Sequence, residues 1–387
     1  MDVHAGSGNE GARAGRWWRA LAFALAAVLT LGTVAMAEAA PGRGGGPPAG
    51  VPAGAGQAQG GPPVTVMTRN LYLGSELVGL FAAGSAEQLV AATSEVWANV
   101  LASDFPARAE LLAAEVAEDK PLLIGLQEVS QFTAVGAGGS ITVDFLDILL
   151  DALADAGLSY EAVAIAPAFE GTLPAIDPTL GFVQATLLDR DVILVRTDVP
   201  PAQLTVLDEQ VGLFDAALEL PVVGLDEPLR IDRGWGYVDV RVRNREFRFV
   251  NTHFEAFDPG EFIRVQQAQE LLDGPLDTDL PVVLLGDFNS NAEANGLAYG
   301  ILTGPGGFED VWSLTNPGDP GLTCCHDADL RNEEVDLRSR IDLVLIRDGV
   351  RARDAHVIGI DPALRTPAGQ WPSDHAGVVA RVMITAR

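Results

Sequence analysis

Short apolar runs of strand length recur along the chain after residue 63. The first two lie at residues 64–68 and 122–126. Compact apolar runs of this length, bounded by polar residues, are typical of buried strands. Further β-rich runs dominate the second half of the chain and lie at residues 160–166, 191–196, 237–242, 247–252, 282–285, 341–346 and 376–382.

Helical periodicity appears between the first of these runs. Residues 143–156 carry their apolar side chains on one stripe and are followed by Gly157, which predicts an amphipathic helix that ends there. A Ser-x-x-Gln capping box at residues 85–88 and Asp104 in front of Pro106 predict two more helix starts. Strands mixed with segregated helices predict packed sheets with helices outside.

The N-terminal part has a different composition. Three arginines precede an apolar run at residues 20–34, and small residues follow, so we expect residues 1–39 to be a signal peptide and the protein to be secreted. The run is too short to span a bilayer. Residues 40–63 are nearly all Gly, Pro, Ala and Gln, which predicts a disordered linker. No repeat or second linker follows, so we expect residues 64–387 to form one domain, a monomer without a stable membrane span.

Charge narrows the classes of partner. The chain has 53 acidic and 25 basic residues and a formal net charge of −28. Such a surface repels polyanions at long range, which weighs against a nonspecific nucleic-acid scaffold. A nuclease is not excluded, because a local site can outweigh the global field over the few ångströms where a phosphate docks.

Polar residues suited to metal or phosphate chemistry stand where the short segments end. If these strands share a sheet edge, their endings meet in one place. One further segment, Arg-Ile-Asp, begins a strand instead. The residues are Asn70, Gln127-Glu128, Asn251-Thr252-His253, Asp287-Phe288-Asn289 and Ser373-Asp374-His375, with Arg340-Ile341-Asp342 at the strand start.

These six motifs, in this order, resemble those of the endonuclease/exonuclease/phosphatase superfamily, which includes deoxyribonuclease I. The resemblance spans Asn70 to His375. It implies an α+β fold, a four-layer sandwich of two packed mixed β-sheets flanked by helices. It also implies a divalent-metal-dependent hydrolase that cleaves a phosphodiester by in-line attack of water.

The resemblance assigns two carboxylates and one amide to a metal ion. Glu128 is the principal ligand, with Asn70 and Asp374 beside it, and the ion is Mg²⁺, or Mn²⁺ or Ca²⁺. Some family members carry an acidic residue two positions after the first asparagine. Here that residue is Tyr72, so the sequence supports no firm second metal site.

The resemblance assigns the remaining motif residues to catalysis. Asp287 orients or deprotonates the attacking water, and Asn289 holds this water or the phosphate. His253 donates to the phosphate or the leaving oxygen. His375 pairs with Asp342, which favours the imidazolium form.

The substrate stays open at this stage between a nucleic acid and a phospholipid headgroup or other small phosphodiester. The acidic charge favours the second class, whereas the sequence shows no exposed aromatic hairpin that would insert into a membrane. A catalytically silent binding protein on the same fold is the alternative function. Cys324 and Cys325 are adjacent and can form a vicinal disulfide, pair between chains or remain free thiols.

Overall fold

The computed structural model describes residues 63–257 and 260–385. The predicted signal peptide and residues 40–62 of the predicted linker lie outside the described residues. The described part belongs to one compact unit. Among its residues, no helix has the length and apolar content needed to cross a membrane.

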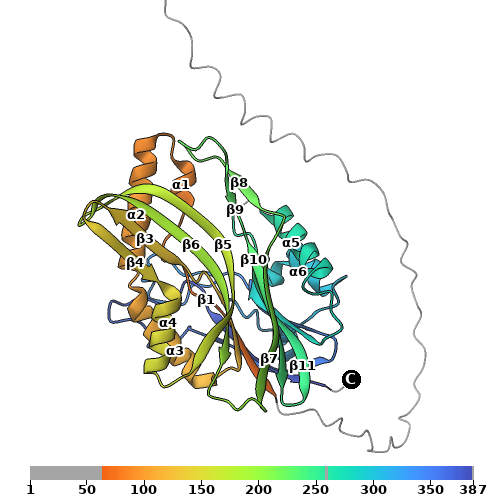
Figure 1. Ribbon diagram of the computed structural model, residues 1–387. Helices are drawn as coiled ribbons and strands as arrows, with labels where there is room; N and C mark the ends of the chain where they lie inside the picture. The colour runs from red at the N-terminus through yellow and green to blue at the C-terminus, as the bar shows by residue number, and fades with distance from the viewer. Residues whose placement is uncertain (1–62, 258–259, 386–387) are drawn as a thin grey trace, which may run out of the picture. The chain divides into compact units, whose positions relative to one another are not determined.

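Helices are concentrated in two groups, one before β5 and one after β11 (Figure 1). The helices are α1 (Val78–Ala82), α2 (Ala86–Ala102), α3 (Phe105–Asp119), α4 (Phe145–Asp155), α5 (Glu261–Asp273), the 3₁₀ helix η2 (Ala292–Ala294), α6 (Leu297–Thr303) and α7 (Val311–Thr315). The strands are β1 (Val64–Asn70), β2 (Leu123–Gln127), β3 (Gln131–Gly136), β4 (Gly139–Asp144), β5 (Tyr160–Asp177), β6 (Gly181–Arg196), β7 (Leu204–Leu213), β8 (Leu218–Leu220), β9 (Leu229–Ile231), β10 (Gly234–Val242), β11 (Arg245–His253), β12 (Val282–Asp287), β13 (Glu309–Asp310), β14 (Asp342–Arg347), β15 (Val350–Ile358) and β16 (Gly377–Ile384).

The strands form two large mixed sheets and one small one. Sheet A has the order β15-β16-β1-β2-β6-β3-β4, with β5 paired to β6, and sheet B has the order β13-β14-β12-β11-β10-β7. β8 and β9 form a separate pair. Each large sheet contains one parallel pair, β1 with β2 and β11 with β12. The carboxyl ends of parallel strands lie at the same sheet edge, so these pairs bring their terminal residues together.

Three apolar clusters fill the spaces between the layers of helices and sheets. One cluster joins sheet A to α2, α3 and α4, and contains Trp97 and Phe145. A second lies between the two sheets, with Val66 from sheet A and Phe249 from sheet B. The third joins sheet B to α5 and α6, and includes Leu271. The helices accordingly lie outside the sheets (Figure 1), and the predicted four-layer α+β sandwich is confirmed.

Two glycines allow close approach beside the strand ends. A Cβ on Gly286, whose φ is +144°, would lie 1.9 Å from the carbonyl oxygen of Thr252 on the neighbouring strand. A Cβ on Gly125 would lie 2.2 Å from Leu285 of the facing sheet. Glycine at position 286 therefore allows β12 to approach β11 closely, and glycine at position 125 allows the two large sheets to pack closely.

The observed helix caps agree only in part with those predicted from the sequence. The side chain of Ser85 accepts from the N–H of Gln88, as the capping box predicts. Asp104 precedes α3 in a left-handed conformation and makes no side-chain cap bond, so its predicted capping role is wrong. The helix predicted from residue 143 begins at Phe145, because Val143 and Asp144 complete β4.

The largest difference from the sequence expectation is the β5–β6 hairpin. The strands predicted at 160–166 and 191–196 extend to Asp177 and from Gly181. Much of the added length faces solvent on at least one side, so it carries no apolar run to reveal it. At the tip, Ile176 pairs with Phe182, and these side chains are 57% and 61% exposed. The expectation that no aromatic hairpin is exposed is therefore wrong.

Candidate active site

Three neighbouring strands of sheet B place three predicted site residues in one row. His253 ends β11 and is in register with Asp287 at the end of the parallel strand β12. Asp287 is in turn in register with Asp342, which begins the antiparallel strand β14. The expectation that these polar endings meet at one sheet edge is confirmed.

Sheet A supplies the opposite side of the site. Asn70 ends β1 in register with Gln127, and Glu128 follows directly. Glu128 has a φ of +56°, a left-handed conformation that is uncommon for a residue with a side chain and is found at functional sites. The hydroxyl of Ser373 donates to the carbonyl of Asn70 at 2.9 Å and so fixes the segment that carries Asp374.

A buried arginine holds the loops on both sides of this segment. The Arg108 guanidinium on α3 donates to the carbonyls of Leu71 at 2.6 Å, Tyr72 at 3.1 Å and Pro372 at 3.0 Å. The first two residues follow Asn70, and Pro372 precedes the Ser-Asp-His motif. Arg108 therefore fixes the relative position of two loops that are far apart in the sequence.

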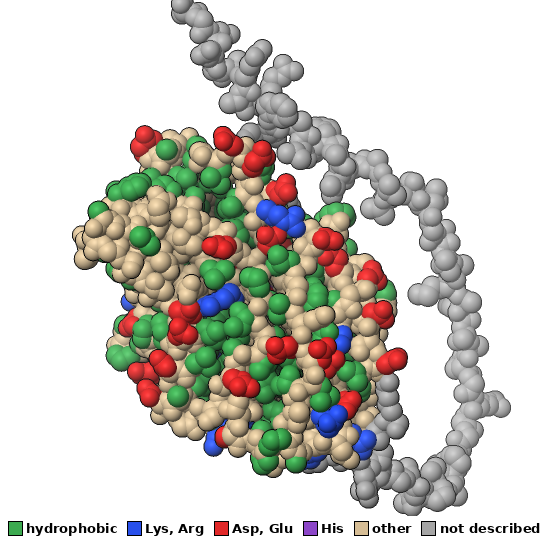
Figure 2. All heavy atoms as spheres, in the orientation of Figure 1, with side chains coloured by type: hydrophobic (Ala, Val, Ile, Leu, Met, Phe, Trp, Pro, Cys, Tyr) green, Lys and Arg blue, Asp and Glu red, His purple; other side chains and the backbone are tan. Residues whose placement is uncertain are grey.

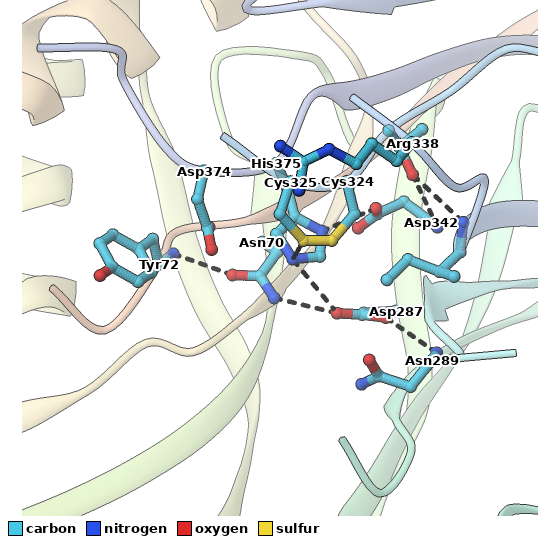
Figure 3. Close-up of a disulfide and its surroundings, with 12 residues drawn as sticks. Asn70, Tyr72, Asp287, Asn289, Cys324, Cys325, Arg338, Asp342, Asp374 and His375 are labelled. Atoms are coloured by element: carbon cyan, nitrogen blue, oxygen red, sulfur yellow. Dashed lines mark hydrogen bonds and ion pairs between the residues drawn. A yellow bond between two sulfur atoms is a disulfide. The ribbon is translucent and has the colours of Figure 1, made fainter. Parts of the chain in front are cut away.

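Asp287 lies at the centre of the site (Figure 3). The side-chain nitrogen of Asn70 donates to Asp287 Oδ2 at 3.1 Å. The Nε2 atoms of His253 and His375 lie 3.6 and 3.8 Å from the same oxygen. One carboxylate oxygen thus faces two imidazoles that come from different sheets' edges.

The environment of Asp287 suits proton transfer. Burial, followed by the nearby charge of Asp342, raises the pKa of Asp287 to about 7. The N–H of Asn289 donates to Asp287 Oδ1 at 2.9 Å and leaves Oδ2 directed at the site. A carboxylate with a pKa near neutrality can both accept and release a proton at physiological pH.

His375 is held by a buried carboxylate. Its Nδ1 lies 2.8 Å from Asp342 Oδ2. Burial disfavours the imidazolium, but the charges of Asp342 and Asp374 outweigh it and raise the pKa of His375 well above its usual value. The predicted Asp342–His375 pair is therefore present, with Nδ1 engaged and Nε2 directed toward the site.

His253 is neutral, in contrast to His375. Burial, then Arg233 and His375, lower the pKa of His253 well below its usual value. Arg233 donates toward Nδ1 at 3.4 Å and cannot accept, so the ring proton is on Nε2. His253 Nε2 is buried and has no hydrogen-bond partner within the described residues. A donor is therefore available at the centre of the site.

Sequence reasoning missed a buried ionic cluster behind His253. Arg233 lies 4.0 Å from Asp189 and 3.8 Å from Glu255. Asp191 Oδ1 lies 3.9 Å from His253 Nδ1, and neither carboxylate oxygen of Asp191 has a hydrogen-bond partner among the described residues. The Asp-Arg-Asp run at residues 189–191, which interrupts the apolar stretch of β6, was the signal that could have revealed this cluster.

Glu128 and Asp374 form an acidic corner beside Asp287. Asn70 donates to Glu128 Oε1 at 3.0 Å and the N–H of Leu73 donates to Oε2 at 2.7 Å. Burial, then Asp374 and Asp189, raise the pKa of Glu128 to about 7. Hard carboxylate oxygens that repel one another in a half-buried place fit a divalent cation, which would remove the repulsion.

The amide of Asn70 faces this corner with its nitrogen. Its oxygen accepts from the N–H of Tyr72 at 2.8 Å. The predicted ligand role of Asn70 therefore requires the amide to rotate, whereas Glu128 and Asp374 present oxygens as they stand. Tyr72 also has a left-handed φ of +59° and directs its hydroxyl to the carbonyl of Ala328 at 2.7 Å, away from the corner.

Cys324 and Cys325 form a disulfide beside His375 (Figure 3). Cys325 Sγ lies 3.7 Å from His375 Nε2. The backbone of Cys324 bridges to both Ser339 and His375. Of the three states that the sequence leaves open, the structure shows the vicinal disulfide, and it borders the site.

The sequence also matches a protein-family model. The model described as the endonuclease/exonuclease/phosphatase family matches residues 96–375. The chain belongs to this family. Endonuclease/exonuclease/phosphatase proteins hydrolyse phosphoesters, so this protein is a hydrolase of that class. No curated protein sequence matches the chain significantly.

Solved structures of endonuclease/exonuclease/phosphatase proteins share the fold. A family protein from Bacteroides thetaiotaomicron is 18% identical, with a TM-score of 0.52 over 84% of this chain and 98% of that one. A mannosyl-6-phosphatase from the same organism is 18% identical, with a TM-score of 0.50 over 82% and 99%. The human nocturnin catalytic domain with bound sulfate anion is 16% identical, with a TM-score of 0.51 over 84% and 95%. At these identities the likeness shows the fold alone.

Proposed function

We propose that the protein is a secreted phosphodiesterase that depends on a divalent cation, Mg²⁺ or in its place Mn²⁺ or Ca²⁺. One observation carries the proposal: Asp287 faces the Nε2 atoms of His253 and His375 beside the acidic corner of Glu128 and Asp374. A base, hydrogen-bond donors and hard metal ligands are the parts that phosphodiester hydrolysis requires.

Each protein group has a distinct task in this proposal. Glu128 and Asp374, with Asn70 after its amide rotates, would hold the cation, which supplies charge neutralisation at the phosphate oxygens. Asp287 accepts a proton from the attacking water through Oδ2. His253 donates its Nε2–H to a phosphate oxygen.

The charged imidazolium completes the arrangement. His375 places positive charge opposite the negative charge that develops on phosphate in the transition state. Asp342 holds the ring through Nδ1, so the Nε2–H points at the substrate. Asn289 fixes Asp287 through its backbone N–H.

The test is hydrolysis of bis-p-nitrophenyl phosphate by the purified protein. We expect activity with Mg²⁺ or Mn²⁺ and loss of activity with a chelator. Glu128→Ala and His375→Ala should each reduce kcat by about a hundred- to a thousandfold, the range for removal of one group that stabilises the transition state. His356→Ala is the matched control, because His356 is on β15 and exposed. Full activity in the presence of chelator would contradict the proposal.

The acidic surface favours a small or lipid phosphodiester over a nucleic acid. Acidic side chains are scattered over the face in Figure 2, where Lys and Arg are few. A polyanionic duplex gains little from such a surface. Release of a phosphorylated headgroup from liposomes, measured beside plasmid nicking, separates the two substrate classes.

Secretion rests on the N-terminal sequence. We propose cleavage after Ala37 or Ala39, at the end of the small-residue stretch. Sequencing the N-terminus of protein recovered from the culture medium tests this. Recovery of the chain only inside the cell, with Met1 retained, would contradict it.

A further inference from the structure

A cavity of about 360 Å³ opens directly beside the acidic corner. Its walls come from the segment around α1, from α2, from the β5–β6 hairpin and from the loop that leads to β9. Volumes of this size are typical of small-molecule pockets. Most of the wall is apolar and includes Leu73, Val96, Trp97, Phe132, Leu173 and Leu187.

The charged side chains that are buried or half-buried in this wall stand at one end. They are Glu128, Asp374, Asp189 and Arg233, all members of the active site or of the cluster behind His253. Arg233 is the one basic residue among the described residues that line the cavity. The cavity therefore has a reactive end and an apolar body.

Apart from the exposed Glu76, the outer part of the cavity is also largely apolar. Val78 and Leu225 line it and are 60% and 43% exposed. Phe81 on α1 contacts Phe257 edge-to-face, with ring centroids 5.3 Å apart. Apolar surface that continues from a pocket to its rim marks a binding site for an apolar group.

We propose that this cavity binds the apolar part of the phosphoester substrate, an alkyl chain linked to the phosphate. This rests on the proposed function, because the phosphate is placed at Glu128 and Asp374. An alkyl chain fits the observations better than a nucleobase or a sugar, because those would leave polar edges against an apolar wall. The structure therefore assigns an amphiphilic phosphoester as the substrate class.

The first experiment measures binding without turnover. Methyl, hexyl and decyl phosphate, each below its critical micelle concentration, are titrated into the Mg²⁺-loaded protein by calorimetry. We expect affinity to rise about three- to fourfold for each methylene that is buried, which gives about tenfold for two buried methylenes and about a few hundredfold if all of those added from methyl to hexyl phosphate are buried. Affinity that is independent of chain length would overturn the proposal.

A matched pair of variants separates the cavity from the surface. Ala185 on β6 lines the cavity, whereas its neighbour Gln184 is exposed and does not line it. Ala185→Leu should remove most of the dependence on chain length, and Gln184→Leu should keep it. An equal effect of both variants would mean adsorption to the outer surface and would overturn the proposal.

Two further readouts keep this inference distinct from the proposed function. Hydrolysis of bis-p-nitrophenyl phosphate reports the proposed function: if it is absent, that proposal fails whatever binds in the cavity. If hydrolysis is present but alkyl phosphates bind no better than methyl phosphate, only the cavity proposal fails. Thymidine monophosphate that binds more tightly than hexyl phosphate would assign the cavity to a nucleobase instead and would also overturn it.

Discussion

At the scale of single residues, the site depends on two histidines in opposite protonation states. His253 lies against Arg233 and is neutral, and His375 lies between carboxylates and is charged. The family resemblance predicts the imidazolium of His375 through its pairing with Asp342, but it does not predict the neutral state of His253. The distinction comes from Arg233, Asp342 and Asp374, which are brought to the rings by the fold.

Asp342→Asn tests the pairing with His375. The amide keeps the shape of the side chain but removes the negative charge that favours the imidazolium. We expect kcat on bis-p-nitrophenyl phosphate to fall about a hundredfold or more. Asp354→Asn is the control, because Asp354 is half-exposed and pairs with Arg381. A fall in activity of less than about threefold would show that Asp342 has no such role.

His326 predicts a pH dependence of stability. It is buried, it stacks on Trp371, and its Nδ1 accepts from Asn332 at 2.8 Å, which requires this nitrogen to be unprotonated. Burial, then Arg69, lower its pKa to about 4. The unfolded chain, with a pKa near 6.5, binds the proton first, so this contribution is complete above pH 6.5 and is lost as the pH falls toward 4.

The measurement is the melting temperature at pH 7.5 and at pH 4.5. His326→Gln should shrink the difference between the two values, because the variant lacks one of the groups that titrate in this window. His356→Gln should leave the difference unchanged, since His356 is exposed. An unchanged difference in His326→Gln would refute the assignment.

At the scale of elements, the strands position the site and glycines set their spacing. Gly286 precedes Asp287 in β12 and lies against the backbone of Thr252 in β11. A side chain there would push apart the two strands whose ends carry His253 and Asp287. The position therefore affects both stability and the geometry of catalysis.

We expect Gly286→Ala to lower the free energy of unfolding by about 3 kcal/mol, the upper end of the usual cost of overpacking a well-packed interior. Gly300→Ala in α6 is the control. Its Cβ would have no neighbour within 4 Å, so the change should be neutral or stabilising by up to about 1 kcal/mol. Urea denaturation of both variants measures the difference. Equal stabilities would contradict the packing described here.

The site strands could be predicted from sequence because each is a short apolar run that ends in a polar residue. β2 and β12 are buried along their whole length, so the pattern is unambiguous. The outer part of the β5–β6 hairpin and α1 could not be predicted in this way, because their exposed positions mix polar and apolar residues. The cavity is built largely from these segments, so it too was invisible in the sequence.

Flanking charged residues were equally hard to interpret. Arg69 lies next to Asn70 at the end of an apolar run, where an arginine usually makes a surface ion pair. In the structure it is buried and pairs with Glu115 at 3.0 Å. It also donates to the carbonyl of His375. Burial of an arginine depends on partners supplied by distant segments, and one sequence does not reveal such partners.

At the scale of the whole molecule, the formal net charge of −28 sets how substrates approach. An acidic surface repels a polyanion, and salt screens the repulsion. If the enzyme accepts any oligonucleotide, we expect its KM to fall as ionic strength rises from about 50 to 200 mM, opposite to the trend for a basic nuclease.

The comparison substrate is a neutral or zwitterionic phospholipid, whose KM should change little over the same range. Steady-state kinetics at constant Mg²⁺ measures both. A KM for the oligonucleotide that rises with salt would show a cationic binding surface that outweighs the global charge.

The position of β1 has a consequence for synthesis of the protein. β1 lies between β2, its parallel neighbour, and β16, its antiparallel neighbour near the end of the chain. Asp374 and His375 stand immediately before β16 and reach the site when that strand pairs with β1. A growing chain therefore carries Asn70 and Glu128 long before it can complete the site, and hydrolysis has to wait until the last strand has been made.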